Sequence, residues 1–266
     1  MTVPLFAVAS GKGGVGKTVL SIALAQSFAK RGERTLLFDG DIGLANIDVQ
    51  LGLQPKGDLM EIVAGEMSME DAVSPWGGGA DVLGGFDVLA GQSGSGALRG
   101  LPERELALLG QSLKLVSAAY DRTVVDLGAG LDTAVLDLAS LCDRALVVLT
   151  DEPTSLTDAY ALIKVMMQRT RPPVVAVVVN MASDETEGRR VYGALTRATE
   201  RFLGLKPPLA GIVRRDARVR DAIRAQTPYL TRCPSGATTQ DIEKLAAAID
   251  AVFAPRAAAL ALAQVK

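Results

Sequence analysis

Two lysines stand five residues apart in a glycine-rich stretch near the start of the chain. The stretch reads SGKGGVGKTVL from Ser10 to Leu20, and its centre fits the phosphate-binding pattern G-x-x-x-x-G-K-[ST]. Glycines let the backbone approach a phosphate closely and adopt positive φ, and consecutive N–H groups then surround the anion. We expect Lys17 to reach the β- and γ-phosphates of a nucleotide and the Thr18 hydroxyl to ligate Mg²⁺. The pattern does not explain Lys12.

The segments around this loop favour a binding site over a glycine turn with an accidental lysine. Residues 4–10 form an apolar run typical of a buried strand, and residues 17–30 have helical spacing of apolar side chains. A strand before the loop and a helix after it are the context that a phosphate-binding loop requires.

Three aspartates close two further apolar runs. Asp39 and Asp41 end the run 34–41, and Asp126 lies in the run 123–130. In a doubly wound sheet, ligands bind outside the carboxyl ends of the strands, which is also where the phosphate loop lies. Carboxylates there can hold Mg²⁺ directly or through water, or position an attacking water. The alternative, that these aspartates only cap helices, is weaker for three residues than for one.

The order of elements predicts an α/β fold: a doubly wound, mostly parallel sheet with helices on both faces. Most predicted strands are continuous apolar runs, which is typical of strands buried on both faces. We predict strands at 4–10, 34–41, 86–91, 123–130, 144–150, 173–180 and 208–213. Between them we predict helices at 17–30, 103–119, 132–141, 154–169, 186–202, 216–225 and 238–253. The Gly-rich region 77–100 reads as a mobile loop or linker around the strand at 86–91, within one domain.

Composition bounds the function. The 266 residues carry a net charge of −2, so the chain lacks the overall basic charge that is typical of nucleic-acid-binding proteins. Its two cysteines have no close partner in the sequence, which favours a cytosolic protein. Histidine is absent, so proton transfer must use carboxylates, lysine, water or the substrate. No apolar run is long enough to span a membrane, and the N-terminus lacks the basic region of a signal peptide. We expect Cys142 and Cys233 to be packing residues, and Trp76 to be a half-buried loop residue rather than a partner anchor.

The C-terminal third holds two weaker signals. We expect residues 1–254 to form one ATPase domain, with Pro255 ending the last helix and residues 255–266 forming a tail with at most a short helix. That tail has few basic residues, so membrane binding through it is the minority interpretation. Residues 189–224 contain ten basic and three acidic residues, a net of +7. We favour a solvated helix face over DNA binding, with an acidic partner or an anionic lipid surface as alternatives.

The phosphate loop is more specific than the general pattern. KGGVGKT resembles the deviant Walker A motif of the MinD/ParA family of ATPases, in which the extra lysine is a signature matched by Lys12. The resemblance implies a homodimer that encloses ATP, with Lys12 reaching the partner's phosphates and with Lys12, Lys17 and Asp41 as catalytic residues. It implies that Thr18, Asp39 and Asp126 hold Mg²⁺, with Asp39 and Asp41 in switch I. It implies that ATP or ADP is bound by Gly11, Lys12, Gly13, Gly14, Val15, Gly16, Lys17, Thr18, Glu152, Asn180, Arg214 and Asp216, with Asn180 at the adenine.

Four stretches resemble one branch of that family, the FlhG/FleN/YlxH regulators of flagellar number. They are FDGDIGLANIDVQLGL (38–53), VLAGQSGSGAL (88–98), TDEPTSLTDAYALIK (150–164) and RRDARVRDAIRAQTPYL (214–230). The resemblance implies a slow, partner-stimulated ATPase whose dimer regulates flagellar number or placement. The implied partners are an FlhF-type GTPase, switch-complex proteins or a transcriptional regulator, at the inner membrane or cell pole or in the cytoplasm.

Two other function classes share this fold. A redox enzyme like nitrogenase iron protein needs cysteine ligands near the switch regions, and the sequence LGAGLD after Asp126 has none. A ParA/MinD-type ATPase that positions DNA, a division site or other cargo is the main alternative. The stretch 150–164 argues against it, and DNA is an unlikely partner.

Overall fold

A single sheet organises the molecule. A computed structural model describes residues 5–41, 45–57, 59–91 and 103–263. Within them, eight strands lie in the order β3-β4-β2-β5-β1-β6-β7-β8, and every neighbouring pair except β3–β4 is parallel. Their bounds are β1 Leu5–Ser10, β2 Thr35–Gly40, β3 Ser74–Trp76, β4 Phe86–Leu89, β5 Arg122–Ala129, β6 Arg144–Leu149, β7 Val174–Ala182 and β8 Leu209–Arg214. The predicted fold class is confirmed.

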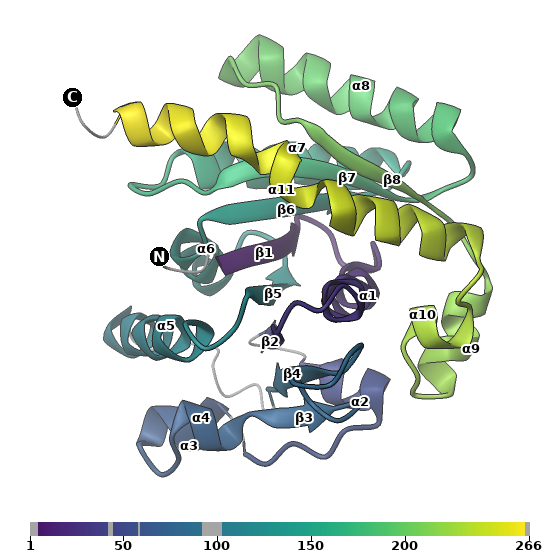
Figure 1. Ribbon diagram of the computed structural model, residues 1–266. Coiled ribbons are helices and arrows are strands. Elements are labelled where there is room, and N and C mark those ends of the chain that lie inside the picture. The colour runs from purple at the N-terminus through teal and green to yellow at the C-terminus, as the bar shows by residue number, and fades with distance from the viewer. Residues whose placement is uncertain (1–4, 42–44, 58, 92–102, 264–266) are drawn as a thin grey trace.

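Helices cover both faces of the sheet, as Figure 1 shows. One core lies under α1 (Lys17–Lys30), α2 (Ile47–Leu51), α9 (Arg218–Arg224), α10 (Tyr229–Arg232) and α11 (Ala237–Ala263). The other lies under α3 (Leu59–Ala64), α4 (Met69–Ala72), α5 (Glu103–Ser117), α6 (Thr133–Leu141), α7 (Pro153–Met167) and α8 (Glu185–Leu203). Alternate residues of one strand serve the two cores: Phe6 and Val8 face the first, and Leu5 and Ala7 face the second. This arrangement explains why β1 reads as a continuous apolar run.

The sequence did not predict the edge strand β3. It has three residues, contains Pro75 and pairs antiparallel with β4. So short a strand has no readable periodicity, and proline is tolerated there because an edge strand needs fewer N–H donors. Trp76 therefore lies in a strand and not in a loop, although it is half-buried as predicted, with its ring 4.9 Å from that of Phe86.

The prediction that Pro255 ends the last helix is wrong, because α11 continues to Ala263. Proline removes one hydrogen bond to the carbonyl four residues earlier and its ring crowds that carbonyl, but these effects can kink a helix without ending it. The two cysteines, by contrast, are buried and unpaired, in agreement with a packing role.

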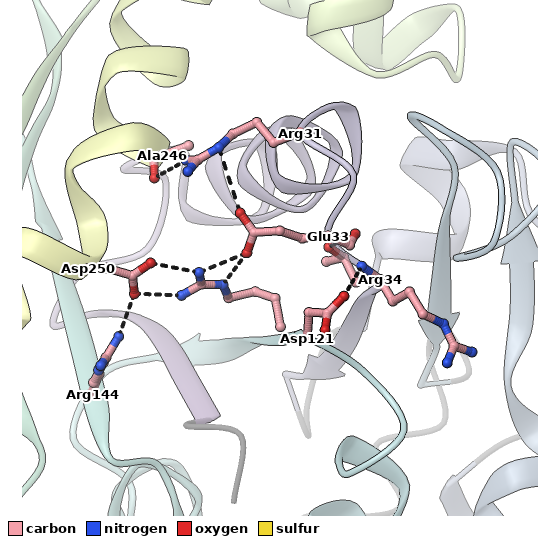
Figure 2. Close-up of polar contacts among 9 residues, drawn as sticks. Arg31, Glu33, Arg34, Asp121, Arg144, Ala246 and Asp250 are labelled. Carbon is pink, nitrogen blue, oxygen red and sulfur yellow. Dashed lines mark hydrogen bonds and ion pairs between the residues drawn. The ribbon is translucent and has the colours of Figure 1, made fainter. Parts of the chain in front are cut away.

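Ion pairs fasten α11 to the amino ends of the central strands, at the edge opposite the phosphate loop. Arg122, the first residue of β5, donates to Glu33 at 2.8 Å and to Asp250 of α11 at 2.9 Å, and its guanidinium lies 4.6 Å from the centre of the Phe28 ring. Arg144, the first residue of β6, also reaches Asp250, at 2.8 Å, as Figure 2 shows. Because the Arg122 side chain is 9% exposed, these carboxylates neutralise a nearly buried charge.

Candidate functional site

The loop between β1 and α1 presents its backbone to solvent. Gly14 and Gly16 have φ of 80° and 79°, a left-handed conformation that glycine adopts without strain. Gly16 is the residue that precedes the first turn of α1, so the free N–H groups of that turn point out of the loop. A Cβ added to Gly13 or Gly14 would meet nothing within 4 Å, which leaves that side open to a ligand.

Gly11 is constrained by a different contact. A Cβ at this position would collide with the backbone carbonyl of Asp158 in α7. The glycine therefore lets α7 pack directly against the start of the loop, which fixes the loop's position relative to the residues that precede α7.

A cavity of about 950 Å³ opens above the loop. Twelve of the predicted site residues line it: Lys12, Gly13, Gly14, Val15, Gly16, Lys17, Thr18, Asp41, Glu152, Asn180, Arg214 and Asp216. Gly11, Asp39 and Asp126 are not among its lining residues. The topology thus brings five separate segments together at the carboxyl edge of the sheet, where doubly wound folds bind ligands.

Lys17 and Asp126 form a buried pair under the cavity. Lys17 Nζ lies 3.7 Å from Asp126 Oδ1, and the Ser21 hydroxyl donates to the same oxygen at 2.8 Å. Burial raises the pKa of Asp126, and the charge of Lys17 and the hydroxyls of Thr18 and Ser21 oppose the shift. Asp126 Oδ2 is buried, and it accepts no hydrogen bond from the residues that the structure describes. A buried carboxylate oxygen without a donor is the feature that a hydrated cation would satisfy.

Asp39 lies beside Asp126, but its carboxylate accepts hydrogen bonds from the backbone of the residues that follow β2. Asp39 and Asp126 are register neighbours on adjacent strands. One Asp39 oxygen accepts from the backbone N–H of Asp41 at 3.1 Å, and the other accepts from Asn46 and Ile47 at 3.0 and 3.1 Å. Burial and the neighbouring Asp126 carboxylate raise the pKa of Asp39 to about 7. In this structure Asp39 anchors both sides of the segment 42–44, which lies outside the described residues.

Asp41 reaches the cavity from the end of β2. A Cβ on Gly128, two residues after Asp126 and still within β5, would lie 3.2 Å from an Asp41 carboxylate oxygen. Switch I, at Asp41, therefore lies close to the end of β5 beside the loop. A carboxylate there can accept a hydrogen bond from a water molecule in the cavity.

Lys12 turns towards α7. Its ammonium pairs with the Glu152 carboxylate and donates to the Thr154 hydroxyl at 2.9 Å, and its side chain is 32% exposed. Glu152, which the resemblance assigns to the nucleotide, here holds Lys12. Thr154 was not among the predicted site residues, although it belongs to the stretch 150–164 on which the resemblance rests.

Asn180, Arg214 and Asp216 form the far wall of the cavity, and each has a partner within the chain. Asn180 Nδ2 donates to the Val15 carbonyl at 2.8 Å, which ties β7 to the loop. Arg214 makes two bonds of 2.7 Å to Asp241.

The remaining wall residue, Asp216, accepts from the Tyr229 hydroxyl at 2.7 Å and from both the backbone and side chain of Arg218. These bonds, that of Arg218 first, lower the pKa of Asp216. Arg214 and Asp216 thus face the cavity as groups that are already paired within the chain.

The donor set fits a nucleotide with one bound Mg²⁺. Among the described residues, no group of three or more His, Cys, Asp or Glu side chains could hold a metal by itself. Mg²⁺ bound with a nucleotide needs only one or two protein oxygens, since phosphates and water supply the others. Thr18 and Asp126, with its unpaired oxygen, meet that requirement.

The comparisons with known proteins agree with this geometry. The model of the family described as CobQ/CobB/MinD/ParA nucleotide binding domain matches residues 6–229. The antiactivator FleN of Pseudomonas aeruginosa is 35% identical over 250 residues, which cover 93% of this chain and 86% of FleN. The flagellum site-determining protein YlxH of Helicobacter pylori is 28% identical, over 90% of this chain and 79% of YlxH.

A solved structure shows the same fold. The septum site-determining protein MinD of Pyrococcus horikoshii, complexed with Mg-ADP, superimposes with a TM-score of 0.78 at 21% identity, over 93% of this chain and 96% of that one. None of the helices in the described ranges combines the length and the hydropathy that a membrane span requires.

Proposed function

The chain belongs to the CobQ/CobB/MinD/ParA family of nucleotide-binding domains, and from that premise we propose that it is an ATPase whose ATP-bound dimer regulates flagellar number or placement. The observation that carries the proposal is the division of labour between the two lysines. Lys17 is buried beneath the cavity, whereas Lys12 is half-buried and is bound by Glu152 and Thr154.

The loop and α1 bind the phosphates of ATP or ADP. Backbone N–H groups of residues 11–18 surround the anion, and Lys17, already placed by Asp126, neutralises its charge. The Thr18 hydroxyl and Asp126 hold Mg²⁺, Asp126 through its unpaired oxygen, and Asp39 supports them from the adjacent strand. Bound Mg²⁺ would supply charge neutralisation on the β- and γ-phosphates.

Asp41 positions the attacking water. Its carboxylate lines the cavity next to the loop and lies close to Gly128, near the end of β5. With no histidine in the chain, a carboxylate at this place is the group suited to orient water and accept a hydrogen bond from it. Replacing Asp41 should therefore slow hydrolysis and prolong the ATP-bound state.

Lys12 acts across a homodimer. Exposed ion pairs contribute little free energy, so the pair with Glu152 can open when a second subunit presents its phosphates. Loss of the γ-phosphate on hydrolysis would then remove the contact and return the subunits to monomers. On this account, residues 1–254 form the ATPase domain, and residues 255–266, which begin within α11, remain outside it as a tail.

The partners are flagellar proteins, such as an FlhF-type GTPase, a switch-complex protein or a transcriptional regulator. FleN and YlxH, by their names, act in this system. An exposed aromatic residue supports a protein partner: Phe202 of α8 is 65% exposed, packs against the half-buried Tyr160 of α7 and lies under Arg201. The other five phenylalanines are at most 1% exposed. We place the protein in the cytoplasm, with peripheral contact to the inner membrane or cell pole through its partners or tail.

Deletion and complementation test this function. A strain lacking the gene should assemble an altered number of flagella or misplace them, and the parental gene should restore the pattern. A gene carrying Lys17→Ala should not, because the encoded protein would not bind nucleotide. Restoration by Lys17→Ala, or unchanged flagella together with a plasmid- or septum-positioning defect, would favour the cargo-positioning alternative.

A further inference from the structure

The strand β7 contains a bulge where it borders the cavity. Its residues Val179 and Ala182 pair with Ile212 and Arg214 of β8, so three steps on β7 match two steps on β8. The extra residue falls at Asn180–Met181, and Met181 has a φ of 58°. Bulges next to binding sites redirect side chains, and a left-handed methionine is strained, so the conformation calls for a functional reason.

The bulge turns two successive side chains to the same side. In a regular strand the side chains of Asn180 and Met181 would point to opposite faces of the sheet. Here both reach the phosphate loop: a Cβ added to Gly16 would lie 2.7 Å from Asn180 Nδ2 and 2.8 Å from Met181 Cε. Met181 is half-buried and lines the cavity.

Arg215 holds the strained backbone in place. Its Nε donates to the Met181 carbonyl at 3.3 Å, and its backbone N–H donates to the Ala182 carbonyl at 2.8 Å. The left-handed conformation is thus supported by the residue that follows β8, and the end of the thioether lies beside Gly16 in a cavity that Val213 and Ala217 also line.

We propose that Met181 determines base affinity and specificity, by laying its thioether against the face of the purine whose edge Asn180 contacts. The inference rests on the proposed nucleotide-binding function and adds a residue to it. The loop supplies Lys17 and the N–H groups that suit phosphates, whereas the rest of the lining combines arginines with the apolar side chains of Met181, Val213 and Ile223, and we assign that part of the cavity to the base. A purine ring needs apolar contact on its faces and one or two polar groups at its edge, and sulfur makes favourable contacts with aromatic rings.

Replacement of Met181 by glycine tests the proposal, with Met181→Leu as the matched control. Glycine accepts a φ of 58° without strain but lacks the thioether, whereas leucine keeps an apolar side chain of similar volume. Affinities for Mg-ADP and Mg-CDP are measured by calorimetry, because the smaller pyrimidine covers less of the proposed contact. Thermal unfolding of each variant is followed in parallel.

Met181→Gly should weaken ADP binding about tenfold, equivalent to about 1.4 kcal/mol, and CDP binding at most about threefold. The preference of Met181→Gly for ADP over CDP should therefore shrink, while its unfolding midpoint stays at or above that of the parent. Met181→Leu should stay close to the parent in nucleotide affinity and in unfolding midpoint. An equal loss of affinity for ADP and CDP would show that Met181 acts only through the loop. An unchanged affinity for ADP would show that Met181 does not contact the base. Either result overturns the proposal. If the parent itself binds no ADP, the proposed function fails and not this inference alone.

Discussion

Replacement of Lys12 by alanine should separate nucleotide binding from dimerisation. In the single chain, Lys12 and Glu152 have side chains that are 32% and 60% exposed, and such ion pairs stabilise a protein by about 1 kcal/mol at most. For a chain of this length, that free energy lowers the unfolding midpoint by roughly 2 to 4 °C or less. The Lys12 ammonium is bound to Glu152 and Thr154 and takes no part in the Lys17–Asp126 pair. Lys12→Ala should therefore lower the affinity for ADP less than about threefold, a loss of less than about 1 kcal/mol in binding free energy.

Lys17→Ala should behave in the opposite way. Lys17 is 7% exposed and lies 3.7 Å from Asp126, so its loss removes a positioned cation from the phosphate site. Hydrogen bonds to charged groups contribute about 1.5 to 3 kcal/mol, which predicts a loss of at least about tenfold in ADP affinity.

The assay combines calorimetry with ADP, light scattering with ATP and Mg²⁺, and phosphate release. Lys12→Ala should bind ADP, remain monomeric with ATP and hydrolyse ATP at least about tenfold more slowly, the loss expected for one transition-state contact to a charged group. Thr154→Ala, which removes only a bond that Lys12 makes within its own chain, should dimerise like the parent. The reasoning is refuted if Lys12→Ala dimerises and turns over ATP normally, or if it loses ADP affinity as Lys17→Ala does.

Three further predictions concern the scaffold. Glu33→Ala should lower the free energy of unfolding by about 2 kcal/mol in denaturant titrations, because it removes a partner of the nearly buried Arg122. The control Asp81→Ala, which breaks the exposed pair with Arg34, should change that free energy by less than about 0.5 kcal/mol. The hydrogen bonds from Arg122 lower the pKa of Asp250 from 3.8 to about 2, so the stability that Asp250 contributes is complete above about pH 5 and is lost as the pH falls towards 2. Because the Asp250 side chain is 57% exposed, Asp250→Asn should lower the unfolding free energy by only about 1 kcal/mol at pH 7. At pH 2 the unfolding free energies of the variant and the parent should be almost equal. Gly11→Ala should destabilise the nucleotide-free protein by about 2 kcal/mol or more, because the added Cβ would collide with the Asp158 carbonyl. Gly13→Ala should destabilise it by less than about 0.5 kcal/mol, because a Cβ there meets no atom within 4 Å. Equal unfolding midpoints for the two variants would contradict the steric argument.

The parts of the fold that could be predicted are those encoded by long patterns. Seven strands and the helices between them follow from apolar runs and helical spacing, and the phosphate loop follows from glycines between a strand and a helix. β3 and the helices α2, α3, α4 and α10 could not be predicted, because elements of three to six residues carry no period. Pro255 misled the prediction because proline is a strong but not absolute signal for a helix end.

At the site, the sequence identified residues better than their contacts. It predicted that Lys17, Asp41 and Asn180 would gather at one edge, and the cavity contains all three. It did not indicate that Arg214 is bound to Asp241, since that contact joins β8 to a helix 27 residues further on. The left-handed conformation of Met181 could not be foreseen either, because nothing about a methionine in a valine-rich strand signals a bulge.

The central claim is that ATP changes the oligomeric state, and the mass of the Asp41→Ala variant in solution tests it most directly. Asp41→Ala should bind ATP but not hydrolyse it, so it should persist as a dimer with twice the 27.8 kDa mass of the chain when ATP and Mg²⁺ are present. With ADP, or with Lys12→Ala added, the mass should be that of a monomer. A variant that binds ATP and Mg²⁺ yet remains monomeric at all protein concentrations would contradict the account.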